Sequence, residues 1–303
     1  MTPTILILAY CLLTVVASLF GGWLPSLIKL THLRQQLMMS LVSGLMLGVA
    51  LLHLLPHSVE YLPSISAVAA SMLGGVLVMF FLVRLFHVHS HDSADHHHHG
   101  DDHAHSDHEH DDHEHDDHEH KHRPGRKHQI SWAGLFVGLV IHSLLDGVAM
   151  AASVVADSSH DQQGFSLLGV GTFLAVFLHK PLDSLAITSL MRTGNWSARS
   201  RSVVNVLFAL SCPLGAIIFW AGTSQMIAGH NALLGYALAF SAGFFLCIAL
   251  SDLLPEVSFH SHDRVKLTAV LLLGVAIATG IEMTHSHDHH HDDGSEPHEH
   301  HEH

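Results

Sequence analysis

Four pairs of ionisable side chains, each pair four residues apart, interrupt segments that are otherwise apolar. The pairs are His53 and His57, His142 and Asp146, His179 and Asp183, and Asp252 and Glu256. Residues at positions i and i+4 lie on one helix face, so each pair can present two ligands to a common point. Imidazole and carboxylate without thiolate suit zinc, iron, manganese or nickel better than Cu(I). Interhelical hydrogen bonds are the alternative use for one such pair, but four pairs of metal-ligand type predict a metal site within the apolar segments.

The elements that must position these pairs are long apolar helices. Hydrophobic residues make up 48% of the chain and charged residues 13%, and a helix needs about 20 apolar residues to cross a bilayer. The first span has no basic residue before its long apolar run, so it is interpreted as a retained helix and not as a signal peptide. Cys11, Cys212 and Cys247 all fall inside spans, which predicts no disulfide framework. We expect an all-α membrane protein with eight transmembrane helices, at 3–28, 38–60, 65–86, 130–156, 165–191, 202–223, 232–256 and 265–283.

The negative charge is concentrated in two His-rich segments. The formal net charge is −14, yet 18 of the 27 acidic residues lie within 87–128 and 284–303, so nucleic acid is not expected as a partner. The first segment holds 17 His and is predicted to be a disordered loop that buffers or senses ions, with a passive solvated linker as the alternative. The second could concentrate metal at the entry side. The predicted organisation is helices 1–3 in 1–86, a cytoplasmic loop in 87–128, helices 4–8 in 129–283 and an extracytoplasmic tail in 284–303.

The basic residues predict an orientation. Twelve of the 13 Lys and Arg lie in or beside odd-numbered loops, and cytoplasmic loops accumulate such residues. Both termini are therefore expected outside. In that orientation His142 and His179 lie near the midplane, His57 lies near the outer surface and Glu256 near the inner surface. The pairs thus predict a series of ligands through the membrane.

An internal repeat links the second and seventh spans. The segment Ala-Leu-Leu-His-Leu-Leu-Pro-His at 50–57 aligns with Ala-Leu-Ser-Asp-Leu-Leu-Pro-Glu at 249–256, and Gly44 matches Gly243 at the same offset. Because the two helices are expected to run in opposite directions, we predict an inverted repeat of helices 1–3 and 6–8, which is typical of secondary transporters. Chance convergence on Leu-Leu-Pro is the alternative. The proline in each span is expected to kink its helix and free a backbone carbonyl.

Three of these segments resemble motifs of the ZIP (Zrt/Irt-like) metal transporters. His-Ser-Leu-Leu-Asp-Gly-Val-Ala at 142–149 is similar to the family's His-Asn-x-x-Asp/Glu-Gly-x-Ala motif, and His-Lys-Pro-Leu-Asp at 179–183 resembles a weakened His-Glu-x-Pro-His/Glu motif. The seventh span at 241–256 also resembles the family. The resemblance covers nearly the whole chain and implies that His142, Asp146 and Asp183 are ligands of the main site. It further implies movement of one helix group against another, is compatible with a homodimer, and makes Zn²⁺ the transported substrate, with Fe²⁺, Mn²⁺ or Cd²⁺ as others, and no resident cofactor.

Two residues depart from the family pattern. Ser143 stands in place of the usual Asn, and Lys180 replaces an acidic ligand of a second metal. A cationic side chain at that point favours a mononuclear site. In the absence of metal, Lys180 is expected to pair with Asp146 or Asp183.

The predicted function is transport of a divalent transition metal, zinc first, toward the cytoplasm by alternating access. The chain is not expected to be an enzyme, because an intramembrane metal-dependent hydrolase commonly uses His-Glu-x-x-His and that sequence does not occur in any of the eight predicted spans. A metal exporter is a second alternative, although exporters of the cation-diffusion type usually have six spans and a soluble C-terminal domain. The lack of a transit peptide favours a bacterial cytoplasmic (inner) membrane.

Overall fold

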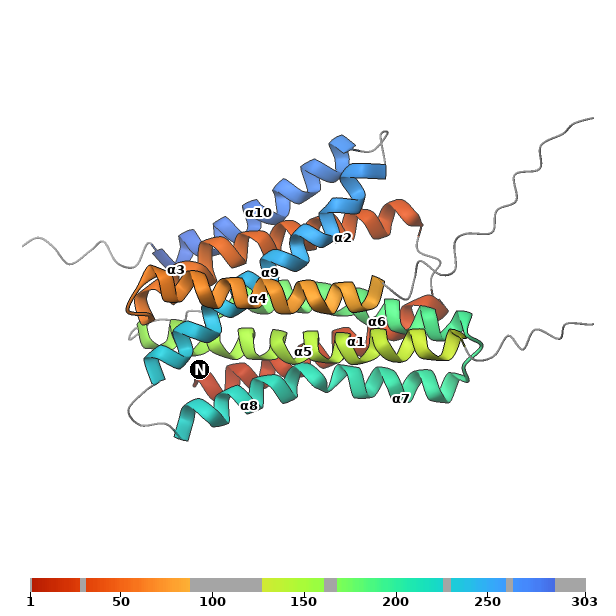
Figure 1. The fold of residues 1–303 in the computed structure, drawn as a ribbon, viewed down its shortest axis with the longest axis horizontal. Helices are drawn as coiled ribbons and strands as arrows, with labels where there is room; N and C mark the ends of the chain where they lie inside the picture. The colour runs from red at the N-terminus through yellow and green to blue at the C-terminus, as the bar shows by residue number, and fades with distance from the viewer. Residues whose placement is uncertain are drawn as a thin grey trace, which may run out of the picture.

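The computed structural model describes residues 2–27, 31–87, 127–160, 168–225, 230–259 and 264–286, and every regular element in them is a helix. Figure 1 shows an elongated bundle whose helices run roughly along one direction. This confirms the all-α prediction. The elements are α1 (Pro3–Leu27), α2 (His32–Gly48), a π-helical turn η1 (Val49–Leu54), α3 (Leu55–Tyr61), α4 (Ile65–His87), α5 (Lys127–His160), α6 (Val170–Thr193), α7 (Ala198–Ala209), α8 (Ser211–Gln225), α9 (His230–Phe259) and α10 (Arg264–Ser286).

Eight helical segments of the described chain are long and apolar enough to cross a membrane, as the sequence predicted. The second consists of α2, η1 and α3, and the sixth consists of α7 and α8. Their bounds differ from the predicted ones by a few residues at each end. They are Pro3–Leu24, Leu33–Tyr61, Ile65–Arg84, Phe136–Ser158, Val170–Thr193, Ala198–Thr223, Ala232–Ser251 and Arg264–Met283.

Prolines account for the two interruptions within spans. Pro213 has no N–H to offer the carbonyl of the preceding turn, and the helix breaks at Leu210, between α7 and α8. In the second span the wider π-helical turn η1 ends two residues before Pro56. Such π-helical turns are frequent at functional sites. The turn was not predicted, and it carries His53, one of the residues singled out in the sequence.

Glycines bring two pairs of helices into backbone contact in what we call the first helix group: α1, α5, α6, α7 and α8. A methyl group on Gly147 of α5 would overlap the carbonyl oxygen of Cys212 on α8, and one on Gly215 of α8 would overlap that of Leu144 on α5. Gly21 of α1 lies equally close to the backbone at Pro181 of α6. Small residues permit this close approach of membrane helices.

The second helix group consists of α2, η1, α3, α4, α9 and α10 and is held together in the same way. Its two closely packed pairs are α2 with α10 and α4 with α9. A methyl group on Gly44 would overlap the carbonyl oxygen of Leu271, and one on Gly243 would overlap that of Met72. The reciprocal glycines, Gly274 and Gly75, meet Leu41 and Phe240 in the same manner.

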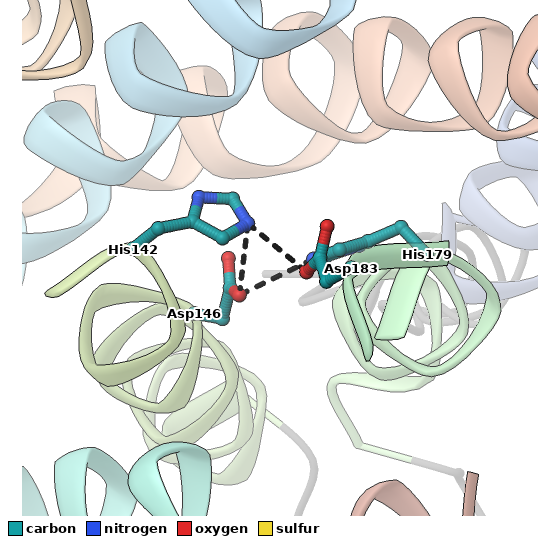
Figure 2. Close-up of side chains that lie close together, drawn as sticks. All are labelled: His142, Asp146, His179 and Asp183. Atoms are coloured by element: carbon teal, nitrogen blue, oxygen red, sulfur yellow. Dashed lines mark hydrogen bonds and ion pairs between the residues drawn. The ribbon is translucent and has the colours of Figure 1, made fainter. Parts of the chain in front are cut away.

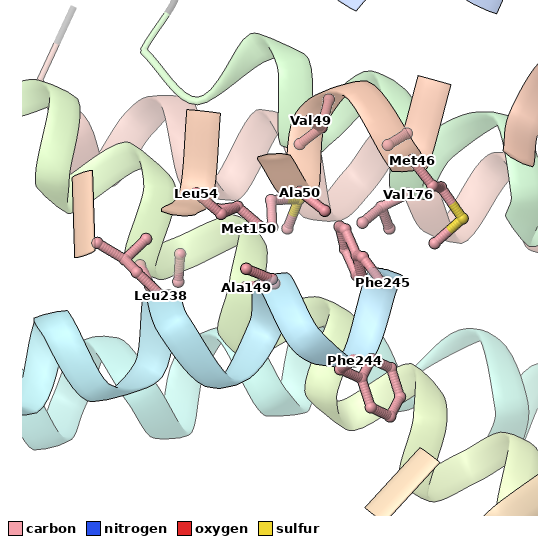
Figure 3. Packing of buried hydrophobic residues seen from close by; sticks show 14 of the residues in the cluster. Met46, Val49, Ala50, Leu54, Ala149, Met150, Val176, Leu238, Phe244 and Phe245 are labelled. Atoms are coloured by element: carbon pink, nitrogen blue, oxygen red, sulfur yellow. The ribbon is translucent and has the colours of Figure 1, made fainter. Parts of the chain in front are cut away.

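The contact between the two groups is made by side chains. Among the described glycines, none approaches a backbone of the other group closely, and Gly171 of α6 meets only methyl groups of Val49 and Ile281 at ordinary distances. Figure 3 shows this interface, in which Met46, Val49, Ala50 and Leu54 of the second group face Ala149, Met150 and Val176 of the first. An interface without such close glycine contacts is easier to separate than the packing within a group, since mainly side chains meet there.

Apolar side chains also cover the outside of the bundle. On α1 the exposed residues Leu8, Leu12, Val16 and Phe20 recur every four positions and form one stripe. In water such a stripe would be unfavourable, whereas hydrocarbon solvates it. The surface therefore agrees with the length and composition of the spans.

Candidate metal centre

Four of the sequence-predicted residues meet between α5 and α6 and form what we call the central quartet: His142, Asp146, His179 and Asp183. In each helix the imidazole precedes the carboxylate by one turn, and Figure 2 shows the two pairs pointing toward each other. One ligand atom from each of the four residues lies within 4.8 Å of all the others. Three of the residues are buried, and Asp183 is the partly exposed one. The structure thus brings together all four residues assigned to the transport site.

The spacing of the donor atoms matches that of a tetrahedral site. His142 Nε2 lies 3.4 Å from Asp146 Oδ2 and 3.5 Å from Asp183 Oδ2. His179 Nε2 lies 3.2 Å and 3.7 Å from the same two oxygens. Four donors that each lie about 2.05 Å from one zinc ion stand roughly 3.3 Å apart at tetrahedral angles. The quartet could therefore bind zinc with only small movements of its side chains.

Neighbouring groups orient the two imidazoles. His179 Nδ1 lies 2.7 Å from the carbonyl oxygen of Ala175, which can only accept a hydrogen bond, so Nδ1 carries a proton, and in the neutral ring Nε2 is the nitrogen available to a cation. The ring of His142 stacks on Phe244 of α9, with centroids 5.3 Å apart. In the described part of the chain, His142 Nδ1 and Asp146 Oδ1 are buried without a hydrogen-bond partner. Buried polar atoms without a hydrogen-bond partner are rare in proteins, so each calls for an explanation, and the binding of an ion is one of them.

Lys180 brings a positive charge into the quartet. The side chain is 1% exposed, its ammonium contacts Asp146, and it lies 3.7 Å from Asp183 Oδ2. The ammonium also lies 5.5 Å from the centroid of the Phe208 ring. The pairing of Lys180 with the aspartates was predicted from the sequence and is confirmed.

A second group of potential ligands, which we call the His53 cluster, consists of His53, His57 and Asp157. Their ligand atoms also lie within 4.8 Å of one another. His53 was predicted as a ligand along the pathway, together with His57, but Asp157 was missed. The fourth span was predicted to end at residue 156, whereas α5 continues to His160. Extending that span by one turn would have placed a carboxylate at the level of the two histidines.

Glu282 is the other residue whose role the sequence analysis missed. Its Oε2 lies 2.9 Å from His53 Nδ1. The other two predicted pathway residues, Asp252 and Glu256, belong to α9. Their side chains lie outside the described part of the structure, so their assignment stays a prediction. The two His-rich segments, 87–128 and 284–303, lie outside it as well, apart from the last residue of α4, the start of α5 and the end of α10.

Comparison with known proteins gives a match over nearly the whole chain. The profile of the ZIP zinc transporter family matches residues 4–282. Zinc transporter ZIP9 of Micropogonias undulatus is 34% identical over 169 residues, which are 50% of this chain and 51% of that protein. Zinc transporter ZIP9-B of Xenopus laevis is 33% identical over 168 residues, 50% of this chain and 52% of that protein. Human zinc transporter ZIP10 is 29% identical over 188 residues, 58% of this chain and 21% of that protein.

The alignments span about half the length of the ZIP9 relatives. The family match is broader, because it begins in α1 and ends in α10 and so includes all eight spans. The family consists of transporters, which removes the basis for the hydrolase alternative. Eight membrane-crossing helices and a match through all of them establish that this chain is a multi-pass membrane protein of the ZIP zinc transporter family.

Proposed function

We propose that this protein carries zinc across the membrane toward the cytoplasm, with the ion bound by the central quartet. The observation that carries the proposal is the meeting of two imidazoles and two carboxylates from α5 and α6 at tetrahedral spacing. Asp146 lies near the middle of the span Phe136–Ser158, and His179 lies near the middle of Val170–Thr193. A buried site at mid-span is reached from one side at a time, as alternating access requires.

One bound ion, not two, is favoured by Lys180. Its ammonium occupies the space beside Asp146 and Asp183 that a second divalent cation would need. Like charges at this separation repel strongly in a buried site. When zinc binds, it replaces the ammonium as the partner of Asp146. Binding of the ion and release of the lysine are therefore linked.

An inverted repeat would supply the two states for alternating access, and the helix contacts support it. The contacts of Gly44 and Gly274 between α2 and α10 recur, at positions displaced by 199 residues, as the contacts of Gly243 and Gly75 between α4 and α9. Thus Gly44 against Leu271 corresponds to Gly243 against Met72. The central quartet is itself composed of two equivalent pairs, since each helix contributes His and Asp four residues apart.

The two helix groups are the bodies that we propose to move. Both pairs of the central quartet belong to the first helix group, so the bound ion travels with it past the second. The side-chain interface between the groups agrees with such sliding. His53 and His57 on one side, and Asp252 and Glu256 on the other, are proposed as ligands along the pathway.

The orientation and domain organisation follow from the charge pattern alone. We propose outside termini, a cytoplasmic His-rich loop at 87–128 that buffers arriving ions, and an outer His-rich tail at 284–303. A homodimer remains an expectation from the resemblance. The relatives named above come from a fish, a frog and a human, so they give no support to the expected bacterial inner membrane.

Zinc uptake into proteoliposomes tests the proposal. The full chain is expected to accumulate zinc, and the double variant His142→Ala, Asp146→Ala is expected to show only the background of empty liposomes. Val137→Ala is a matched control on α5, because that side chain is 56% exposed on the outside of the bundle. Circular dichroism and elution as a single species check the fold of each variant. Unchanged uptake in the double variant would refute the assignment.

The direction of transport needs a separate measurement. Expression in cells whose own zinc uptake has been removed is expected to restore growth at low zinc and to sensitise the cells to high zinc. Protection from high zinc would instead favour the exporter alternative.

A further inference from the structure

The His53 cluster has the geometry of a metal site that is separate from the central quartet. His53 Nε2 lies 3.6 Å from Asp157 Oδ1, and His57 Nε2 lies 3.4 Å from the same oxygen. These separations are close to the roughly 3.3 Å between donors around a tetrahedral zinc ion. Asp157 lies 11 residues beyond Asp146 on α5, so the cluster is about 16 Å along that helix from the quartet.

Both imidazoles present the correct nitrogen to the cluster. The Nδ1 of His57 lies 2.9 Å from the carbonyl oxygen of His53, which can only accept, so this Nδ1 carries a proton. The Nδ1 of His53 lies 2.9 Å from Glu282 Oε2, and a carboxylate likewise accepts. When each ring is neutral, its lone pair is on Nε2, so a cation held beside Asp157 Oδ1 would find a donor on both rings. Metal-bound histidines are typically fixed in this way, with the other ring nitrogen donating to a carboxylate or carbonyl group.

The carboxylate of Asp157 is also held in place. Its Oδ2 accepts a hydrogen bond of 2.6 Å from the backbone N–H of Gly169, the residue before α6. Gly169 adopts φ 67°, a left-handed conformation that glycine reaches readily. This bond uses one oxygen and leaves Oδ1 directed at the two imidazoles. All three ligands are therefore oriented before any ion arrives.

The hydroxyl group of Ser153 completes the surroundings of the cluster. Ser153 Oγ lies 2.8 Å from His53 Nε2 and accepts a hydrogen bond of 3.0 Å from Thr172. Since Thr172 supplies a proton to Ser153, the serine proton is available for the Nε2 lone pair. An arriving cation would replace this proton at Nε2. The alternative for the cluster is a purely structural network in which no cation binds.

The ligands come from both helix groups. His53 and His57 lie on η1 and α3 of the second group, and their supporting residue Glu282 lies on α10 of the same group. Asp157 lies on α5 of the first group, which also carries the central quartet. The cluster is complete only while the two groups have the relative position seen here, because movement of α5 along its axis separates the carboxylate from the imidazoles.

From these observations we infer that His53, His57 and Asp157 form a second site for a zinc-like divalent cation, which bridges the two helix groups and stabilises the present arrangement. The ion joins the groups while it is bound and must leave before they move. The consequence for transport rests on the proposed function, whereas binding itself does not. At high zinc, occupancy of this site is expected to slow uptake.

Anomalous diffraction from crystals of the full chain grown with zinc chloride tests the site directly. Above the zinc absorption edge we expect a peak about 2.0–2.2 Å from Nε2 of His53, Nε2 of His57 and Oδ1 of Asp157. The variants His57→Ala and Asp157→Asn are expected to lose this peak and to keep the one at the central quartet. The double variant His142→Ala, Asp146→Ala is expected to show the reverse. His57 is partly exposed, so its replacement is the milder of the two changes.

The possible outcomes separate the two proposals. A wild-type crystal with zinc at the central quartet and none at the His53 cluster would overturn the inference, as would a peak that survives both His57→Ala and Asp157→Asn. A peak at the His53 cluster alone would support the inference and count against the proposed function. In proteoliposomes, uptake by the wild type is expected to fall at high zinc, and Asp157→Asn is expected to relieve that inhibition.

Discussion

The central quartet and the His53 cluster use the same donor types but relate differently to the helix groups. The quartet draws all its ligands from α5 and α6 within one group, and Lys180 contacts one of its carboxylates. The His53 cluster takes ligands from both groups and has supporting contacts from Glu282 and Gly169. A site within one moving body can keep its ion during movement, whereas a site between two bodies cannot. Position relative to the interface, more than ligand chemistry, therefore separates a cargo site from a bridging site.

The most direct test of the difference between the two sites is to remove one carboxylate from each of them. Asp183→Asn is expected to reduce zinc uptake in proteoliposomes to background, since the quartet loses an anionic ligand that no other group replaces. Asp157→Asn is expected to raise the rate at high zinc, because the bridging ion no longer holds the groups together. Initial rates over a range of zinc concentrations measure both effects. Background uptake in both variants would mean that the two sites are not functionally distinct.

Removal of the lysine tests what makes the quartet different. Lys180→Met leaves the buried carboxylate of Asp146 without its cation, and breaking one side of a buried pair costs about 3–5 kcal/mol. In chelator the thermal unfolding temperature is expected to fall well below that of the wild type. Zinc is expected to restore it by supplying the missing charge. Thermal melts with chelator and with zinc measure this, and Lys180→Arg is the control that keeps the charge. Equal melting temperatures in chelator for Lys180→Met and wild type would contradict the assigned pairing.

The close packing within the first helix group can be tested on one helix. Gly215→Ala is expected to destabilise the protein by about 1–3 kcal/mol, because the added methyl overlaps the carbonyl oxygen of Leu144. Gly222→Ala on the same helix has open space at its Cβ and serves as the matched control. It is expected to be neutral or slightly stabilising, since alanine favours helix. Chemical or thermal unfolding in detergent measures both. A similar loss in both variants would contradict the close contact of α5 and α8.

Acid affects both sites in the same direction. Zinc binds imidazole only when Nε2 carries no proton, and it binds carboxylates only when they are ionised, so protons compete with the ion. The apparent KM for zinc is expected to rise as the pH falls, by about tenfold per pH unit for each proton displaced. Uptake assays between mildly acidic and neutral pH, with the same buffer on both sides of the membrane, measure this effect. A KM independent of pH would show that the ligands are not displaced by protons.

Much of the fold and of the central quartet could be predicted from the sequence, for identifiable reasons. Eight long apolar segments are a strong signal, and the spacing of His142 to Asp146 and of His179 to Asp183 fixes two ligands on each helix face. Asp157 could not be found in this way, because its partners come from another span and because it was assigned to a loop. The contact between His53 and Glu282 joins residues far apart in the chain. Only the folded arrangement of α10 beside η1 brings them together.

Lys180, which contacts the central quartet, affects the net charge of the carrier in the proposed transport cycle, both with zinc bound and without it. With neutral imidazoles, Asp146, Asp183 and Lys180 together carry one negative charge when no ion is bound and one positive charge when zinc is bound. Without the lysine the corresponding charges would be two negative and none. The energy of placing charge in an apolar medium grows with the square of that charge. With the lysine present, the net charge has the same magnitude in the loaded and the empty carrier, so this energy is similar in both. An inside-negative membrane voltage would then assist both halves of the proposed cycle to a similar extent, because it drives the positive loaded carrier inward and the negative empty carrier outward.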